Sequence, residues 1–252
     1  GAPRLFLCSR AVPDASTRFV PPGASGAVRV AGHVLGWFSA AGAPDPDPAF
    51  LREPEAAADA PVVADLSGSV LDHVWHLVAG LADRLRQDFA EATTADAPVA
   101  ATPTGVHTIG APQGLLRIAP GATLEPGVVL DVTDGPIWIE EGVTIRAFTR
   151  LAGPAWNGPG TTVLGGSLST VAIGPVCKVR GEVEASTLLG YANKAHDGFL
   201  GHAYIGRWVN LGALTTNSDL KNNYGTIRLP TPAGPVDTGE TKIGAFIGDH
   251  AK

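Results

Sequence analysis

Polar side chains that can do chemistry gather in one stretch of the sequence, between residues 189 and 224. Lys194, His196, Asn210 and Asn217 follow one another there, in a segment otherwise rich in Gly and aliphatic residues. An amine that has to act as a nucleophile needs a base, because its ammonium form has no lone pair. A histidine with a pKa near ~6.5 can take that proton at neutral pH. The segment therefore predicts His196 as a general base, although the bare sequence equally allows a loop histidine paired with Asp197.

The elements that must position these residues are six-residue repeats. Seven hexads begin with an aliphatic residue, at Ile118, Leu124, Ile139, Ile145, Ile173, Ile205 and Leu211. Their fifth position is small or β-branched: Ala122, Val128, Val143, Thr149, Cys177, Val209 and Thr215. Three such hexads form one triangular coil whose interior is filled by the aliphatic residue. The pattern predicts a left-handed parallel β-helix over residues 105–252; an irregular β-sandwich is the alternative fold.

The same repeat assigns several residues to structural roles. Cys177 takes an inward position and is expected to be a small buried residue rather than a nucleophile. Four acidic residues near the corners are expected to be solvated turn residues: Asp131, Asp134, Glu140 and Glu141.

Two further regions precede the repeats. Residues 1–66 mix short apolar runs with Pro- and Asp-rich turns, which is typical of a partial α/β domain. Residues 67–104 are predicted to be a helix and a linker. Apolar residues recur there at helical spacing: Val70, Val74, Leu77, Val78, Leu81, Leu85 and Phe89. Ser67 or Ser69 is the expected N-cap of this helix.

Composition excludes several classes of protein. The formal charge of −6 and the scattered Lys and Arg residues argue against a nucleic-acid partner. Neither a membrane-spanning apolar run nor a signal pattern is present in this sequence, so we expect no membrane association. The two cysteines, Cys8 and Cys177, have no metal-binding or disulfide spacing. We therefore expect a cytoplasmic protein without a bound metal.

The motifs between Ile173 and Tyr224 resemble the acetyltransferase half of the bifunctional enzyme that makes UDP-N-acetylglucosamine, and more closely a divergent GlmU-like family. The segments Asn193-Lys-Ala-His-Asp-Gly-Phe-Leu-Gly201 and Asn210-Leu-Gly-Ala-Leu-Thr215 carry the likeness, which extends over roughly residues 65–252. The first segment is one residue shorter than in that enzyme. The resemblance implies an N-acetyltransferase that uses acetyl-CoA as co-substrate and acts on an amino-sugar 1-phosphate, as a homotrimer.

The resemblance also implies site residues. His196 corresponds to the base, Asn210 to a sugar-contacting residue, and Arg180 to the arginine that holds the sugar phosphate. Three family positions differ, because Phe199 replaces a Tyr and Ala185 and Gly225 replace lysines. We therefore add four residues as substrate-binding candidates: Lys194, Asn217, Lys221 and Tyr224.

The ends of the chain lead to further expectations. Residues 1–66 resemble the closing part of a nucleotidyltransferase domain, without its Gly-rich loop and acidic ligands, so Mg²⁺ is expected only for missing upstream residues. The sequence contains no Met, and residues 242–252 read as a coil that continues. We expect a fragment that binds acetyl-CoA weakly or not at all, and we expect binding once the further coils are present.

Two other functions stay open. One is a catalytically degenerate β-helix that trimerises a sugar nucleotidyltransferase, which the lost phosphate-binding lysines favour. The other is a zinc-dependent carbonic-anhydrase-like β-helix, in which three imidazoles meet at a subunit interface. The spacing of His196 and His202 argues against it, because residues six apart lie on adjacent sides of the prism whereas stacked residues recur at about eighteen.

Overall fold

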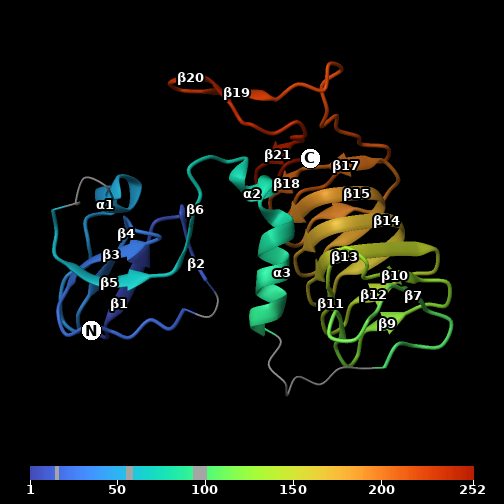
Figure 1. Cartoon of the computed structure of the whole chain (residues 1–252), viewed down its shortest axis with the longest axis horizontal. Helices are drawn as coiled ribbons and strands as arrows, with labels where there is room; N and C mark the ends of the chain where they lie inside the picture. The colour runs from blue at the N-terminus through green and yellow to red at the C-terminus, as the bar shows by residue number, and fades with distance from the viewer. Residues whose placement is uncertain (15–16, 55–58, 93–100) are drawn as a thin grey trace. The chain divides into compact units, whose positions relative to one another are not determined.

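The computed structural model describes residues 1–14, 17–54, 59–92 and 101–252 (Figure 1). The chain folds as two compact units, Gly1–His76 and Leu77–Lys252. Each unit has its own apolar core. The described part of the chain is mainly β, as the sequence predicts.

The first unit is a small mixed sheet. Its four strands run in the order β1-β4-β3-β5, in which β3 and β5 are parallel and the other pairs antiparallel. The core of the unit includes Val28, Leu35 and Phe38. The elements are β1 (Arg4–Leu7), β2 (Ala11–Pro13), β3 (Gly26–Val30), β4 (His33–Ser39), α1 (Pro48–Arg52), β5 (Val62–Leu66) and β6 (Gly68–Val70).

The predicted helix begins later than expected. Ser69 lies in β6, which pairs with β2, so neither it nor Ser67 caps a helix. The backbone groups of residues 68–70 are used in that strand pair, which overrides the helical spacing of Val70. The helices are α2 (His76–Ala79) and α3 (Leu81–Ala92), and the predicted linker falls partly on residues 93–100, outside the described residues.

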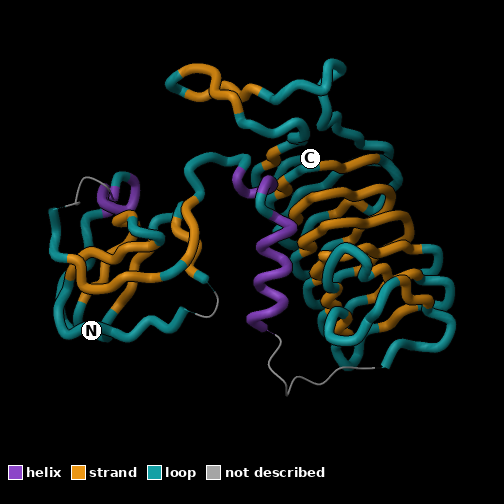
Figure 2. The backbone as a smooth tube through the Cα atoms, in the orientation of Figure 1, coloured by secondary structure: helices purple, strands orange, loops and turns teal. Residues whose placement is uncertain are grey.

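The second unit is a parallel β-solenoid of about five turns, which confirms the predicted class of repeat (Figure 2). Its coils advance along one direction from the strands nearest residue 107 to those nearest the C-terminus (Figure 1). Its strands are β7 (His107–Ile109), β8 (Leu116–Ile118), β9 (Thr123–Leu124), β10 (Val129–Asp131), β11 (Ile137–Ile139), β12 (Thr144–Ile145), β13 (Thr149–Asn157), β14 (Thr162–Ile173), β15 (Lys178–Leu188), β16 (Asn193–Lys194), β17 (Phe199–Gly201), β18 (Tyr204–Ile205) and β21 (Phe246–Ile247).

Three ladders of stacked residues fill the solenoid, one for each side. Within a ladder each residue pairs in register with the equivalent residue of the next coil, so side chains of one kind stack along the axis. The first ladder is Ile118, Ile139, Asn157, Ile173, Leu188, Ile205 and Ile247. The second is Leu124, Ile145, Val163, Val179 and Lys194. The third is Thr108, Leu130, Leu151, Leu168, Val183 and Leu200.

The hexad assignment is largely confirmed by burial. All seven first-position residues are buried, and so is Cys177 at a fifth position. Thr215 is an exception: it is exposed, because the chain leaves the regular coil after Leu211. The reading of Asp131 as a solvated turn residue is wrong. Asp131 ends β10, is 8% exposed, and accepts a 2.6 Å hydrogen bond from Arg150.

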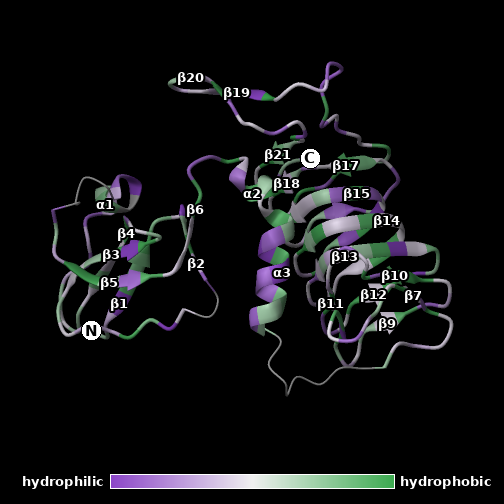
Figure 3. Ribbon diagram, viewed as in Figure 1, coloured by the Kyte–Doolittle hydropathy of each residue, from purple (hydrophilic) through white to green (hydrophobic). Residues whose placement is uncertain are grey.

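Helix α3 packs along the solenoid, against β13, β14 and β15. Its buried residues, Leu81, Leu85 and Phe89, belong to the predicted apolar face. The helix carries apolar and polar residues on different faces (Figure 3). It therefore covers part of one side of the prism.

The final coils carry an insertion between Leu211 and Ile243. A hairpin of β19 (Arg228–Thr231) and β20 (Gly234–Asp237) projects from the solenoid in this insertion (Figure 1). The base of the insertion is closed by an antiparallel bridge between Leu220 and Lys242. The polar residues singled out in the sequence therefore divide between regular coils and this insertion.

Candidate functional site

His196 lies at a corner of the solenoid, between β16 and β17. Its side chain is exposed, and within the described part of the chain its ring makes no hydrogen bond or ion pair. The hypothesis that Asp197 satisfies this histidine is not supported, because the Asp197 carboxylate pairs with Arg180 instead. An imidazole in this position is accessible to a ligand.

Arg180 lies one coil below His196, next to the same corner. Its Nε donates to Oδ1 of Asp197 at 3.0 Å and its Nη1 donates to the carbonyl oxygen of Leu164 at 3.1 Å. Its side chain is 46% exposed. These two bonds fix the plane of the guanidinium group and use two of its five N–H donors.

Lys194 is at the same corner but points inward. It is 2% exposed, and its Nζ donates to the carbonyl oxygens of Arg180 (2.8 Å), His196 (3.1 Å) and Gly198 (2.9 Å). An ammonium group has three N–H donors, so no donor is left for a substrate in this arrangement. Burial lowers the pKa of Lys194, and the nearby charge of Asp197 opposes this effect.

The sequence did contain a signal for the inward direction of Lys194. This residue follows Leu188 by six positions and precedes Leu200 by six, so it takes the first position of a hexad. Both neighbours are buried ladder residues. The repeat therefore places Lys194 inside the prism, whereas its type alone suggested a surface position.

Asn210 lies on the side that leads into this corner. It is exposed, it pairs with Asn193 in the coil below, and its Oδ1 accepts a 2.7 Å hydrogen bond from Nδ2 of Asn193. The Asn193 Oδ1 atom is buried and has no hydrogen-bond partner among the described residues. Among the described residues no hydrogen bond is made by the amide nitrogen of Asn210.

The remaining candidates lie on the insertion. Asn217 uses both amide atoms on the backbone of Gly201, accepting from its N–H and donating to its carbonyl at 2.9 Å each. Lys221 donates to the carbonyl oxygen of Thr226 at 2.8 Å, and Tyr224 is 72% exposed. Asn217 is thus committed to holding the insertion on the coil. The structure brings Arg180, Lys194 and His196 to one corner but not Lys221 and Tyr224.

The structure also describes the three positions at which the sequence differs from the family that it resembles. Phe199 is half-buried in β17, Ala185 has a positive φ of 44°, and Gly225 donates its N–H to the side chain of Asn223. None of them brings a charge to the corner that holds His196.

One pair was missed by reading the sequence. Nδ1 of His202 lies 2.7 Å from Oδ2 of Asp219, and the side chains are 18% and 10% exposed. The two residues are 17 positions apart, close to one coil, so the repeat period could have suggested the contact. This carboxylate-bound imidazole is on the next corner along the coil from His196.

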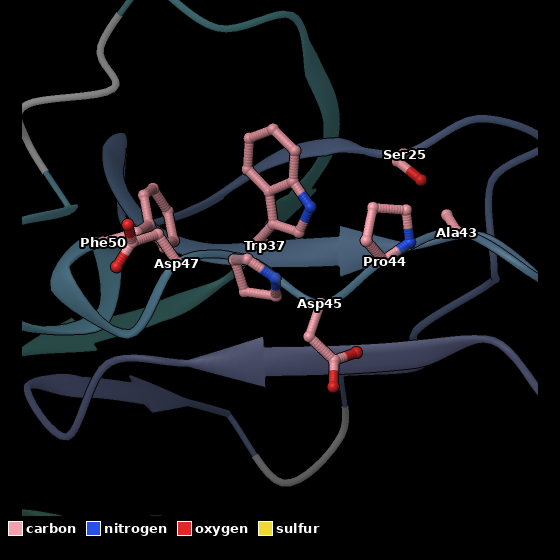
Figure 4. A pocket seen from close by; sticks show the side chains of 8 residues that line it. Ser25, Trp37, Ala43, Pro44, Asp45, Asp47 and Phe50 are labelled. Carbon is pink, nitrogen blue, oxygen red and sulfur yellow. The ribbon is translucent and has the colours of Figure 1, made fainter.

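A cavity of about 230 Å³ lies within the first unit and is lined by residues of that unit (Figure 4). Its lining includes Trp37, Phe50, two prolines and the acidic residues Asp45 and Asp47. Asp45 pairs with Arg4, and Asp47 accepts a hydrogen bond from the N–H of Ala49. Its acidic groups thus already have partners within the unit.

Among the described residues no three His, Cys, Asp or Glu side chains gather in a way that could hold a metal ion. The described helices are all too short or too polar to cross a membrane. No family model matches the sequence, and no curated protein matches it either.

Proposed function

We propose that this chain is the β-helix part of an acetyl-CoA-dependent N-acetyltransferase that acts on an amino-sugar 1-phosphate in UDP-N-acetylglucosamine synthesis. The proposal takes the solenoid to be left-handed and the parent protein to carry a sugar-1-phosphate nucleotidyltransferase as well. It also takes the protein to be cytoplasmic. The observation that supports it best is the accessible imidazole of His196 beside the Arg180–Asp197 pair at one corner.

The chemistry assigns one role to each of these groups. His196 takes a proton from the ammonium group of the sugar, and the resulting amine attacks the thioester carbonyl. The nitrogen of the tetrahedral intermediate loses its extra proton, the intermediate collapses to the amide and expels the coenzyme thiolate, and the thiolate takes up that proton to leave as the thiol. Arg180 holds the phosphate through charge-assisted hydrogen bonds, and the accessible amide of Asn210 binds a sugar hydroxyl. Backbone N–H groups of the coil between Gly201 and Gly212 are the candidates for stabilising the oxyanion.

The proposed homotrimer has a candidate interface on another corner. Val176, Tyr191 and Trp208 take successive corner positions there, each with a positive φ, and are 51%, 41% and 55% exposed. The rings of Tyr191 and Trp208 stack at 4.4 Å. Exposed apolar residues in a row favour burial against another copy.

The degenerate trimerisation module is a second candidate, and one observation favours it. The buried ammonium of Lys194 is committed to backbone carbonyls, so it replaces neither lysine that the resembling family uses for phosphate. A phosphate at this corner would then be held chiefly by Arg180.

The experiment that separates the two candidates is an assay of thiol release from acetyl-CoA by the full-length parent protein with glucosamine 1-phosphate. Under the proposal the wild-type protein is active, and His196→Ala lowers the rate by roughly 10² to 10⁴, the usual effect of losing a general base. A wild-type trimer without acetyl transfer to any amino-sugar phosphate would establish the trimerisation module instead.

A further inference from the structure

Lys194 is a charged residue in a ladder whose other members are aliphatic. In the second ladder the residues below it are Leu124, Ile145, Val163 and Val179, all buried. The four-carbon stem of Lys194 continues this apolar stack, and its ammonium group ends at the corner. Burying an ammonium costs free energy unless each N–H finds an acceptor. Here three carbonyl oxygens supply those acceptors.

These carbonyls belong to two successive coils of one corner. Arg180 contributes its carbonyl from the coil below, and His196 and Gly198 contribute theirs from the same coil as Lys194. The remaining carbonyl of the corner, that of Asp197, accepts a 2.9 Å hydrogen bond from the N–H of Leu214, at the start of the insertion. The backbone of residues 196–198 is therefore held from inside the prism and from the insertion.

The corner has little freedom to be rebuilt without the ammonium group. Gly198 has a φ of +134°, and a Cβ there would overlap the carbonyl oxygen of Thr215. The Asp197 side chain is already paired with Arg180. The side chain of His196 is the one group of residues 196–198 that extends to solvent without a partner in the described structure. Its direction follows from the backbone that Lys194 holds.

We propose that Lys194 is a positioning residue: an internal cation that fixes the corner 196–198 and thereby orients His196 and the Arg180–Asp197 pair. The catalytic consequence rests on the proposed function, whereas the positioning itself does not. A cage of three carbonyl oxygens also suits a small ammonium ion, so a truncated lysine can be replaced by a soluble amine.

The test compares Lys194→Ala with Lys178→Ala, which removes an exposed lysine from β15. We expect Lys194→Ala to lower Tm, and n-propylammonium to restore much of the loss. Tetramethylammonium at the same ionic strength serves as control and restores nothing, because it has no N–H to donate. Lys178→Ala should respond alike to both salts. Equal responses of Lys194→Ala to the two salts would overturn the internal cation.

The second measurement follows His196 itself, by the ring ¹H–¹³C resonances of the wild-type protein, Lys194→Met and Lys194→Gln. We expect the His196 resonance to shift and broaden in Lys194→Met, and less in Lys194→Gln, which keeps two N–H donors. The resonances of His202 should stay unchanged as an internal control. An unchanged His196 resonance in folded Lys194→Met overturns the positioning role. If Lys194→Ala and Lys194→Met do not fold, the comparison of Lys194→Gln with the wild-type protein decides alone. An unchanged His196 resonance in Lys194→Gln then overturns the positioning role.

The third measurement is acetyl transfer by the full-length protein. Lys194→Met should lower kcat roughly 10²-fold, the scale expected for a slightly misplaced catalytic group, with an unchanged KM for acetyl-CoA. Addition of n-propylammonium should recover activity in Lys194→Ala. A wild-type protein without activity would contradict the proposed function only, because the Tm and resonance measurements still decide on the cation. An active wild type with full activity in Lys194→Met would contradict the positioning role only.

Discussion

The Nδ1 atom of His202 lies 2.7 Å from Oδ2 of Asp219, and this contact joins a regular coil to the insertion that follows Leu211. Two backbone bonds flank it: the N–H of Ile243 donates to the carbonyl of Asp219, and the N–H of Gly244 donates to the carbonyl of His202. Asn217 adds its two bonds to Gly201. The base of the insertion is thus tied to the solenoid by side chains at one corner.

Removing the carboxylate should therefore destabilise the protein. We expect Asp219→Ala to lower the free energy of unfolding by about 1–3 kcal/mol, because it leaves a largely buried imidazole N–H without its acceptor. Chemical denaturation at neutral pH measures the change. Asp83→Ala is the control, since Asp83 is 92% exposed and pairs only on the helix surface, where the expected change is below about 0.5 kcal/mol. Equal effects of the two substitutions would show that the His202–Asp219 contact contributes nothing.

The Asp131–Arg150 pair should make stability depend on acid pH. Hydrogen bonds from Thr133 hold the pKa of Asp131 below its ordinary value, the Arg150 guanidinium adds to this, and burial opposes it. Because the folded-state pKa is lower than the unfolded value of about 3.9, the stabilisation is complete above that pH and is lost as the pH falls through the folded pKa. We expect the stability difference between wild type and Asp131→Asn to be constant from pH 5 to 7 and to shrink below about pH 4. Urea unfolding across this range measures it, and a difference that persists undiminished to pH 2 would refute the assignment.

Asn157 should be a position at which stability can be gained. It lies between Ile139 and Ile173 in the first ladder, is fully buried, and neither atom of its amide group has a partner among the described residues. An unsatisfied buried amide costs about 1–3 kcal/mol, so Asn157→Leu should raise the free energy of unfolding by a similar amount.

Thr161 provides the matched control inside the same prism. Its hydroxyl donates to the carbonyl of Gly174 and accepts from the N–H of Cys177, so Thr161→Val should destabilise where Asn157→Leu stabilises. Thermal and urea unfolding of both variants tests the contrast. Loss of stability in both would mean that the Asn157 amide is satisfied in solution.

Arg180 should control affinity for the phosphorylated acceptor. We expect Arg180→Ala to weaken binding of glucosamine 1-phosphate about 10- to 100-fold, because a charge-assisted hydrogen bond contributes about 1.5–3 kcal/mol. Arg180→Lys should recover only part of the affinity, since an ammonium group cannot form the planar fork. Calorimetry with the phosphate and with unphosphorylated glucosamine measures the difference. Arg150→Ala, which removes an arginine from another coil, is the control. Equal affinity of Arg180→Ala and Arg150→Ala for glucosamine 1-phosphate would show that Arg180 has a structural role alone.

The sequence determined the repeat because the interior of a solenoid imposes the same demand on every coil. Aliphatic residues six apart must fill one prism, and the residues picked from that spacing, such as Ile118, Ile173 and Ile205, are the buried ladder residues. The apolar face of α3 could also be predicted, because residues three and four apart lie on one side of a helix. The start of that helix was misplaced because β6 pairs with β2, a partner more than fifty residues away that local spacing cannot reveal.

Tertiary structure decided what the polar residues do. Lys194, His196 and Arg180 could be picked from the sequence by their residue types. Only the stacked coils show that Lys194 points inward to three carbonyl oxygens and that Asp197 forms an ion pair with Arg180. They also show that the ring of His196 is accessible. An apolar residue has one favourable place, out of water, so its pattern can be read along the chain. A polar residue is satisfied by whichever donor or acceptor lies in reach, and in a solenoid that partner comes from the coil above or below.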